Sequence, residues 1–132
     1  MCTLTIVKQP NNGWLITMNR DEAVNRQEGE PVVVFKNNKL YSWRPVDKQA
    51  GGSWFGVTNG RALALLNRYQ DADVFNNQLK NNQKNSAKQN PHFVLESRGR
   101  LIEELLLCGS DVEIERALQA FTLRNFAPFD LW

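Results

Sequence analysis

The chain is poor in the side chains that build metal sites and disulfide frameworks. Its 132 residues include one histidine and two cysteines, Cys2 and Cys108. Because these residues lie far apart, they form no metal-ligand spacing, and we expect no metal or other cofactor. His92 follows a proline beside a polar segment and is expected to be exposed. No disulfide framework is indicated either, so a reducing cytoplasm is the expected location.

Long apolar runs and an excess of one charge are also missing. No stretch approaches the ~20 apolar residues of a membrane span, and no basic start leads into the apolar stretch of a signal peptide. The net charge is +2, with basic and acidic residues interspersed. This balance argues against a nucleic-acid groove or binding to an anionic membrane. The composition and length predict one soluble globular domain over residues 1–132.

The first half of the chain has the alternating pattern of β-strands. Turn signals at Asn11–Asn12–Gly13, Asn37–Asn38 and Thr58–Asn59–Gly60 divide it into three predicted hairpins. The six predicted strands are 3–7, 14–18, 31–35, 40–43, 53–57 and 61–66.

The last third of the chain has the period of helices. A first helix from Ser97 is expected to end at Gly109, and Ser110 or Asp111 is expected to cap a second. The apolar face of the first helix consists of Leu101, Ile102, Leu105 and Leu106, and that of the second of Ile114, Ala117, Leu118 and Phe121. Cys108 follows three leucines, so we expect it to pack in the core.

Two further segments lie around these helices. A long polar loop is predicted over 70–96, with its Asn/Gln/Lys-rich part at 70–89 and a short helix over 73–79 as an alternative within it. The apolar end of the chain, 127–132, is predicted to enter another strand. The predicted order is therefore a run of strands, two helices and the start of a further strand.

The glycine-rich segment 50–54 allows two interpretations. A phosphate-binding loop would require a lysine and a following helix, and this segment has neither. We therefore predict a tight turn in which Gly51 or Gly52 has a positive φ and Trp54 is brought onto the sheet. Such a turn could border a pocket.

Cys2 is a candidate nucleophile because it directly follows the initiator methionine. Removal of Met1 would give Cys2 a free α-amine with an ordinary pKa of about 8, close to the ordinary pKa of ~8.5 of a cysteine thiol. The amine could then act as the general base, which suits a chain with a single histidine. The structural alternative is a small buried residue on an N-terminal strand.

The other candidate site residues lie near the ends of predicted strands: Arg20, Asp21 and Asn67. Neighbouring residues of a strand point to opposite faces, so Arg20 and Asp21 can share one site only where the strand ends or bulges. Their structural alternative is a surface turn, and that of Asn67 is a polar strand terminus.

Several ordered landmarks resemble the NRDE family, which includes the transport-and-Golgi-organisation proteins of the second type. The matching residues, in chain order, are Met1–Cys2, Asn19–Arg20–Asp21–Glu22, Arg26, Asp47, 50–57, 65–69, 97–99 and 128–131. The tetrapeptide alone is a weak signal, whereas the ordered set is specific. Family members are commonly longer, and this chain resembles their N-terminal half.

More distantly, the family resembles the N-terminal-nucleophile hydrolases of the choloylglycine and penicillin V acylase branch. That resemblance implies an α+β fold, a four-layer αββα sandwich of which this chain supplies antiparallel strands and then two helices. It implies that Cys2 is the nucleophile and its freed amine the base. Arg20 and Asp21 would orient and tune this centre, and Asn67 would donate to the oxyanion. Further catalytic residues of that branch fall in the half that this chain lacks.

Two functions follow from these resemblances as expectations. The first is hydrolysis of a carbon–nitrogen amide bond of a small molecule through a cysteine acyl-enzyme. The second is a non-enzymatic role in handling haem or another small molecule, or in organising the secretory pathway. A purely structural fragment is a third interpretation. In each case an open apolar sheet face is expected to be covered by a homo-oligomer or by a missing C-terminal half, since exposing it costs about 25 cal/mol per Å².

Overall fold

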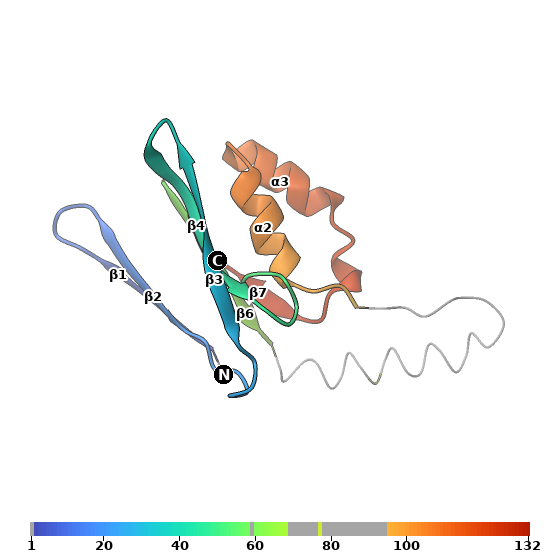
Figure 1. The fold of residues 1–132 in the computed structure, drawn as a ribbon. Coiled ribbons are helices and arrows are strands. Elements are labelled where there is room, and N and C mark those ends of the chain that lie inside the picture. The colour runs from blue at the N-terminus through green and yellow to red at the C-terminus, as the bar shows by residue number, and fades with distance from the viewer. Residues whose placement is uncertain (1, 59, 69–76, 78–94) are drawn as a thin grey trace.

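Antiparallel strands followed by two helices form an α+β fold, seen in a computed structural model that describes residues 2–58, 60–68, 77 and 95–132 (Figure 1). The strands of the first half are β1 (Thr3–Lys8), β2 (Trp14–Asn19), β3 (Glu28–Lys36), β4 (Lys39–Asp47), β5 (Phe55–Thr58) and β6 (Arg61–Asn67). The elements that follow are α2 (Gly99–Leu107), α3 (Asp111–Ala120), the 3-10 helix η1 (Leu123–Asn125) and β7 (Phe129–Leu131). No helix in these described ranges is long and apolar enough to cross a membrane.

The strands form two sheets. β1 and β2 make a two-stranded sheet, here called the N-terminal hairpin, and the other strands make a five-stranded antiparallel sheet in the order β3-β4-β5-β6-β7. The three predicted hairpins are therefore confirmed. The first two turns contain Asn12, Asn37 and Asn38 at φ values of 60°, 52° and 57°, and the third contains Gly60 at 83°. Asparagine tolerates this left-handed conformation better than most residues, which is why these positions are effective turn signals.

Strands β3 and β4 are longer than predicted. Glu28 pairs with Asp47 and Gly29 with Val46, before a register shift between Gly29 and Val32. The shift contains Pro31, which has no N–H to donate to a ladder and therefore sits at an irregularity. The extension matters for function because it carries β4 to Asp47.

Helix α2 covers the centre of the five-stranded sheet. The apolar face predicted for it is confirmed, since Leu101, Ile102 and Leu105 are fully buried at 0% exposure. They pack with Leu63 and Leu65 of β6 in one hydrophobic cluster. Burying such side chains contributes about 1.5–3 kcal/mol each, so this cluster is the main source of stability in the described part of the chain.

The end of α2 differs from the prediction. The helix ends at Leu107, and the extended backbone of Cys108 caps it, with Cys108 N–H donating to the Leu105 carbonyl at 3.2 Å. Gly109 is not in the left-handed conformation that a glycine C-cap adopts. Cys108 is half-buried and lies outside the core cluster, so its predicted core packing is wrong. The capping position places its side chain beside the helix end instead of beneath the helix.

Helix α3 begins as predicted. Ser110 Oγ accepts a hydrogen bond from the Glu113 N–H at 3.2 Å, and Glu113 Oε2 accepts one from the Gly109 N–H at 2.6 Å. These bonds satisfy N–H groups at the start of the helix. The predicted apolar face of α3 packs on the core cluster from outside and is only half-buried: Ile114, Ala117, Leu118 and Phe121.

The predicted strand near the end of the chain is also confirmed. β7 pairs with β6, with Leu131 opposite Leu65 and Phe129 opposite Asn67. The preceding Phe126 is buried and makes edge contacts with the rings of Phe121 and Phe129. β7 therefore closes one edge of the sheet over the end of the core.

The N-terminal hairpin lies on the side of the sheet opposite the helices and diverges from it toward its own turn (Figure 1). Its large apolar side chains remain open to solvent, with Trp14 62%, Leu15 51% and Ile6 48% exposed. The expected open apolar face is therefore present. The hairpin is packed far less than the sheet beneath α2.

Other sequence predictions lie largely outside the described residues. These are most of the polar loop predicted over 70–96, the alternative helix over 73–79, and His92.

Candidate functional site

A cavity of about 360 Å³, here called the pocket, lies where five segments of the chain meet. These segments are the chain after β2, the turn between β4 and β5, the end of β6, the start of α2 and the chain before β7. The lining residues are Arg20, Glu22, Arg26, Asp47, Ala50, Gly52, Ser53, Trp54, Leu65, Asn67, Leu95, Glu96, Ser97, Arg98, Gly99 and Ala127. One wall therefore carries Arg20, Glu22, Arg26 and Asp47, and the wall beside α2 combines small residues with Glu96 and Arg98.

Arg20 enters the pocket because β2 ends one residue before it. Its side chain is only 9% exposed, and its Nη2 donates to Asp47 Oδ2 at 3.1 Å. Its Nη1 donates to the Arg26 carbonyl at 3.3 Å, and the guanidinium lies over the Trp54 ring, 4.3 Å from the centroid. Hydrogen bonds in the guanidinium plane and an aromatic ring on one face together fix its position.

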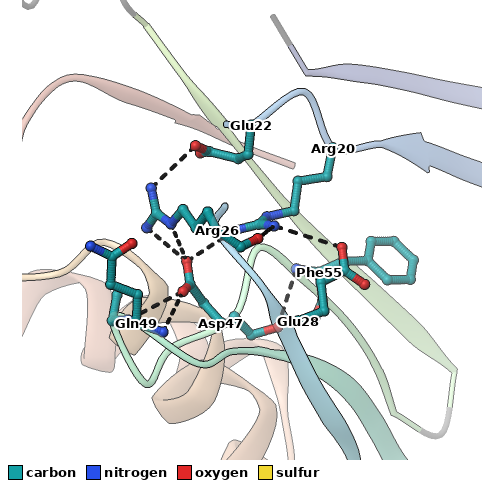
Figure 2. Close-up of polar contacts among 9 residues, drawn as sticks. Arg20, Glu22, Arg26, Glu28, Asp47, Gln49 and Phe55 are labelled. Atoms are coloured by element: carbon teal, nitrogen blue, oxygen red, sulfur yellow. Dashed lines mark hydrogen bonds and ion pairs between the residues drawn. The ribbon is translucent and has the colours of Figure 1, made fainter. Parts of the chain in front are cut away.

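Asp47, at the end of β4, is the centre of this charged wall (Figure 2). It is 5% exposed, and its Oδ2 accepts from both Arg20 and Arg26, the latter at 2.7 Å. Its Oδ1 accepts from the N–H groups of Gln49 at 2.9 Å and Ala50 at 3.2 Å. Burial alone would raise the pKa of Asp47, but the bonds from Arg26, Ala50 and Gln49 outweigh it and hold the pKa below its ordinary value.

Glu22 and Arg26 extend the network toward the N-terminus of the chain. Arg26 Nη1 lies 3.2 Å from Glu22 Oε2, and the Glu22 side chain is 16% exposed. Burial alone would lower the pKa of Arg26, but Asp47 and Glu22 raise it above its ordinary value. Arg26 therefore stays cationic, and the wall alternates basic and acidic side chains (Figure 2).

Cys2 lies at the open end of the N-terminal hairpin. Thr3 and Asn19 form the last pair of the ladder, so Cys2 and Arg20 each lie one residue beyond it, and Arg20 is one of the charges that act on the Cys2 thiol. Thr3 and Asn19 are exposed, whereas Cys2 and Arg20 are both partly buried, as expected for residues on the inner face. Cys2 is a free thiol next to the pocket and is not one of its lining residues.

The surroundings of Cys2 favour a neutral thiol. Burial and the carboxylate of Glu22 raise the pKa of Cys2 above its ordinary value, whereas the N-terminal amine and Arg20 pull it in the opposite direction. At neutral pH the thiol is therefore protonated, and a base is needed to make it nucleophilic.

The two other predicted site residues differ in their placement. Asn67 ends β6, is partly buried and lines the pocket. Asp21 is exposed and is not one of the lining residues, although its neighbour Arg20 is. The structure thus brings Arg20 and Asn67 to one pocket with Cys2 beside Arg20, and it turns Asp21 to the outside.

The glycine turn 50–54 forms the pocket wall next to α2, as its predicted geometry allows. Gly51 has a φ of 75°, which confirms the expected left-handed position. A Cβ on Gly52 would lie 2.7 Å from the backbone of Gly99, so only glycine lets the turn approach the start of α2 this closely. The Ser53 N–H donates to the Gly99 carbonyl at 3.2 Å and joins the two segments.

Residue-level reasoning did not identify Asp47, Arg26 and Glu22 as site residues. All three lay among the ordered landmarks, and Asp47 directly precedes the glycine turn, as a residue that accepts hydrogen bonds from a turn often does. Arg98 also lines the pocket, and its Nη1 donates to the Pro128 carbonyl at 2.9 Å. Among the described residues, no group of three histidine, cysteine, aspartate or glutamate side chains could hold a metal ion.

Comparison with protein families gives a match over the whole sequence. The family model for Transport and Golgi organisation 2 matches residues 1–132. The chain belongs to this family. No curated protein and no solved structure matches it.

Membership of the Transport and Golgi organisation 2 family confirms the resemblance to the NRDE family. In the structure, Arg20 and Glu22 of the Asn19–Arg20–Asp21–Glu22 sequence lie in the pocket wall, together with Arg26 and Asp47. Landmarks that are scattered along the chain therefore meet at one place.

Proposed function

We propose that this member of the Transport and Golgi organisation 2 family hydrolyses a carbon–nitrogen amide bond of a small molecule, with Cys2 as an N-terminal nucleophile. The observation that carries the proposal is that Cys2 lies within the influence of the Arg20 charge, and that Arg20 lines one pocket with Asn67. A nucleophile and an amide group that can donate to an oxyanion are groups that acyl transfer uses, and a nearby cation favours the thiolate.

The first half of the reaction forms an acyl-enzyme. Removal of Met1 would free the α-amine of Cys2, and this amine would take the Sγ proton as sulfur attacks the substrate carbonyl carbon. The Asn67 side chain would donate to the oxyanion, a contribution of roughly 3 kcal/mol when such a donor is preorganised. The amine would then protonate the departing nitrogen, the carbon–nitrogen bond would break, and a thioester would remain on Cys2.

The second half releases the acid. Water would attack the thioester carbonyl and lose a proton to the same amine, and the carbon–sulfur bond would break to give a carboxylic acid and the free thiol. In the chain that retains Met1, burial and Glu22 raise the pKa of Cys2 and keep the thiol protonated, so the cycle requires the freed amine to accept its proton. We place the reaction in a reducing compartment such as the cytoplasm, since Cys2 must remain a thiol.

We also propose that the chain has the fold of the first layers of a four-layer αββα sandwich. A helical layer, a five-stranded sheet and a hairpin on its far side (Figure 1) follow the order of the first layers of a four-layer αββα sandwich. The hydrolases that the sequence distantly resembles have that architecture.

Hydrolysis is tested with a series of acyl p-nitroanilides of increasing acyl size, which release a chromophore when the amide bond breaks. The chain is compared before and after treatment with methionine aminopeptidase, with intact mass showing whether Met1 is present. We expect turnover only after removal of Met1, and an acylated Cys2 peptide in quenched samples. Cys2→Ala should abolish turnover, and Cys108→Ser should leave it unchanged. Equal turnover with Met1 retained, or turnover by Cys2→Ala, would contradict the proposal.

The second candidate is a carrier that holds a small molecule, such as haem, without reaction. The protonated state of Cys2 in the chain favours it, since a carrier needs no activated thiol. A carrier would bind haem with a shifted Soret band while Met1 is retained, and Cys2→Ala would bind equally well. Loss of binding in Cys2→Ala would contradict this role.

A further inference from the structure

We infer that Asp47 is a positioning residue whose carboxylate fixes the guanidinium of Arg20 beside Cys2 and so sets the reactivity of the thiol. The use of this arrangement in catalysis rests on the proposed function, whereas the effect on the thiol can be measured without any substrate. Asp47 is remote from Cys2 in the sequence and acts on the thiol only through Arg20.

Arg20 depends on Asp47 because its own strand no longer holds it. β2 ends at Asn19, where the ladder between β1 and β2 also ends, so no strand pairing fixes the backbone of Arg20. Glu28 also lies 3.7 Å from Arg20, but its side chain is 57% exposed, and such surface pairs are weak. By contrast, the side chains of Arg20 and Asp47 lie 3.1 Å apart and are only 9% and 8% exposed. Both partners are therefore largely removed from water in this contact.

Asp47 can serve as a fixed point because its two oxygens have separate partners. Oδ1 accepts from the Gln49 and Ala50 N–H groups, and the Gly51 N–H donates to the Asp47 carbonyl at 2.7 Å. These bonds hold the carboxylate to the turn at the end of β4. Oδ2 then faces Arg20 and Arg26 (Figure 2). The same division of partners allows the arginine contacts to be removed while the turn is kept.

Asp47→Asn uses this division. An asparagine oxygen can still accept from the turn, while its NH₂ group replaces Oδ2 and meets two guanidinium donors, to which it cannot bond. Arg20 would lose its fixed anion and move. The Arg26 carbonyl and the Trp54 ring would then be the main remaining contacts of the guanidinium.

The positioning role and a simple charge effect predict opposite results. The charged groups that act on Cys2 are Glu22, the N-terminal amine and Arg20. If Asp47 acted only through its own negative charge, its removal would favour the thiolate and speed alkylation. If Asp47 positions Arg20, its removal takes a cation away from the thiol and slows alkylation.

The experiment measures iodoacetamide alkylation of the full-length chain at pH 7, with Cys2 and Cys108 followed separately by peptide mass analysis. We expect Asp47→Asn and Arg20→Gln each to slow the reaction of Cys2 roughly three- to tenfold, since a nearby opposite charge strongly favours the charged form. The double variant should react like Arg20→Gln alone, because Asp47 acts through Arg20. Cys108 serves as the internal control.

Glu103→Gln is the matched control variant. It breaks another short arginine–carboxylate pair, between Arg44 and Glu103 at 2.6 Å, which joins β4 to α2 away from Cys2. Its Cys2 should react at the normal rate. If Asp47→Asn does not fold, Asp47→Glu takes its place, because it keeps the charge but displaces the carboxylate and should still slow the reaction.

Faster or unchanged alkylation in these Asp47 variants, or additive effects in the double variant, would overturn the inference. This failure is separable from that of the proposed function. If the effects of the two substitutions on alkylation are non-additive but no p-nitroanilide is hydrolysed, hydrolysis is refuted and the positioning role is kept. If p-nitroanilides are hydrolysed but the effects on alkylation are additive, the positioning role is refuted and hydrolysis is kept.

Discussion

The sheet beneath α2 and the N-terminal hairpin are both antiparallel β-structure, but they are held in place by different interactions. Leu63 and Leu65 of β6 are 8% and 5% exposed under α2, whereas Leu15 of β2 is 51% exposed. The sheet is therefore stabilised by apolar burial. An isolated two-stranded hairpin is marginal in water. Near Cys2 the hairpin is joined to the sheet by the ionic contact between Arg20 and Asp47.

The largest expected effect comes from cutting this ionic contact. Asp47→Ala should lower the free energy of unfolding by about 3–5 kcal/mol, because it leaves two partly buried arginines without their anion. Urea unfolding measures the change. Glu28→Ala, at the exposed carboxylate near the same arginine, should cost less than about 1 kcal/mol. Similar costs for both variants would mean that the hairpin is held by other contacts.

Truncation of one leucine in each region compares their packing directly. Leu105→Ala, at a side chain with 0% exposure, should cost about 2–5 kcal/mol because it leaves a cavity. Leu15→Ala should cost less than about 1 kcal/mol, since its side chain is half exposed already. Thermal and urea unfolding of both variants provide the test. A large cost at Leu15 would show that the hairpin is covered in solution.

A substitution at the close approach of two backbones should have an intermediate effect. The Cβ of Gly52→Ala would lie 2.7 Å from Gly99, and backbone atoms cannot move aside as side chains do. We expect a loss of about 1–3 kcal/mol, as for overpacking elsewhere, measured by urea unfolding. Gly109→Ala, whose nearest neighbour would be the Glu113 carboxylate at 3.4 Å, should be nearly neutral. A neutral Gly52→Ala would show that the two segments separate in solution.

The smallest expected effect is the loss of the stabilising contribution of Asp47 at low pH. Because the folded-state pKa of Asp47 lies below its ordinary value of 3.8, its stabilising contribution is complete above that pH and is lost as pH falls through the lower folded value. The difference in unfolding free energy between the natural chain and Asp47→Asn should therefore be constant from neutral pH to about pH 5 and shrink below pH 3.8. Urea titrations across this range measure it. A difference that grows in acid would contradict the assignment of the lowered pKa.

Much of the fold could be predicted because its signals are local. The asparagines in the turns marked the hairpins, and Ser110 marked the start of α3, since each acts on backbone groups within a few residues. The end of α2 was missed because the chain leaves the helix at Cys108 before it reaches a glycine. The extension of β4 was missed because Pro31 concealed a register shift in β3.

The site was harder to predict because its contacts are not local. Arg20 and Asp47 lie 27 residues apart, and they meet only when the chain after β2 reaches the end of β4. Sequence reasoning identified the types of residue at Cys2, Arg20 and Asn67, but it could not show that Asp47 binds two arginines. The resemblance also assigned Asp21 to the same centre as Arg20, and in the structure Asp21 is exposed and is not one of the residues that line the pocket.

The close approach of Gly52 and Gly99 gives the pocket two unequal walls. The wall beside α2 is joined backbone to backbone and cannot shift without moving a helix whose leucines are fully buried. The opposite wall carries Arg20 on a hairpin with little apolar packing. A bound molecule should therefore enter and leave when the N-terminal hairpin moves relative to the sheet. The rigid wall beside α2 should determine which molecular shapes fit in the pocket.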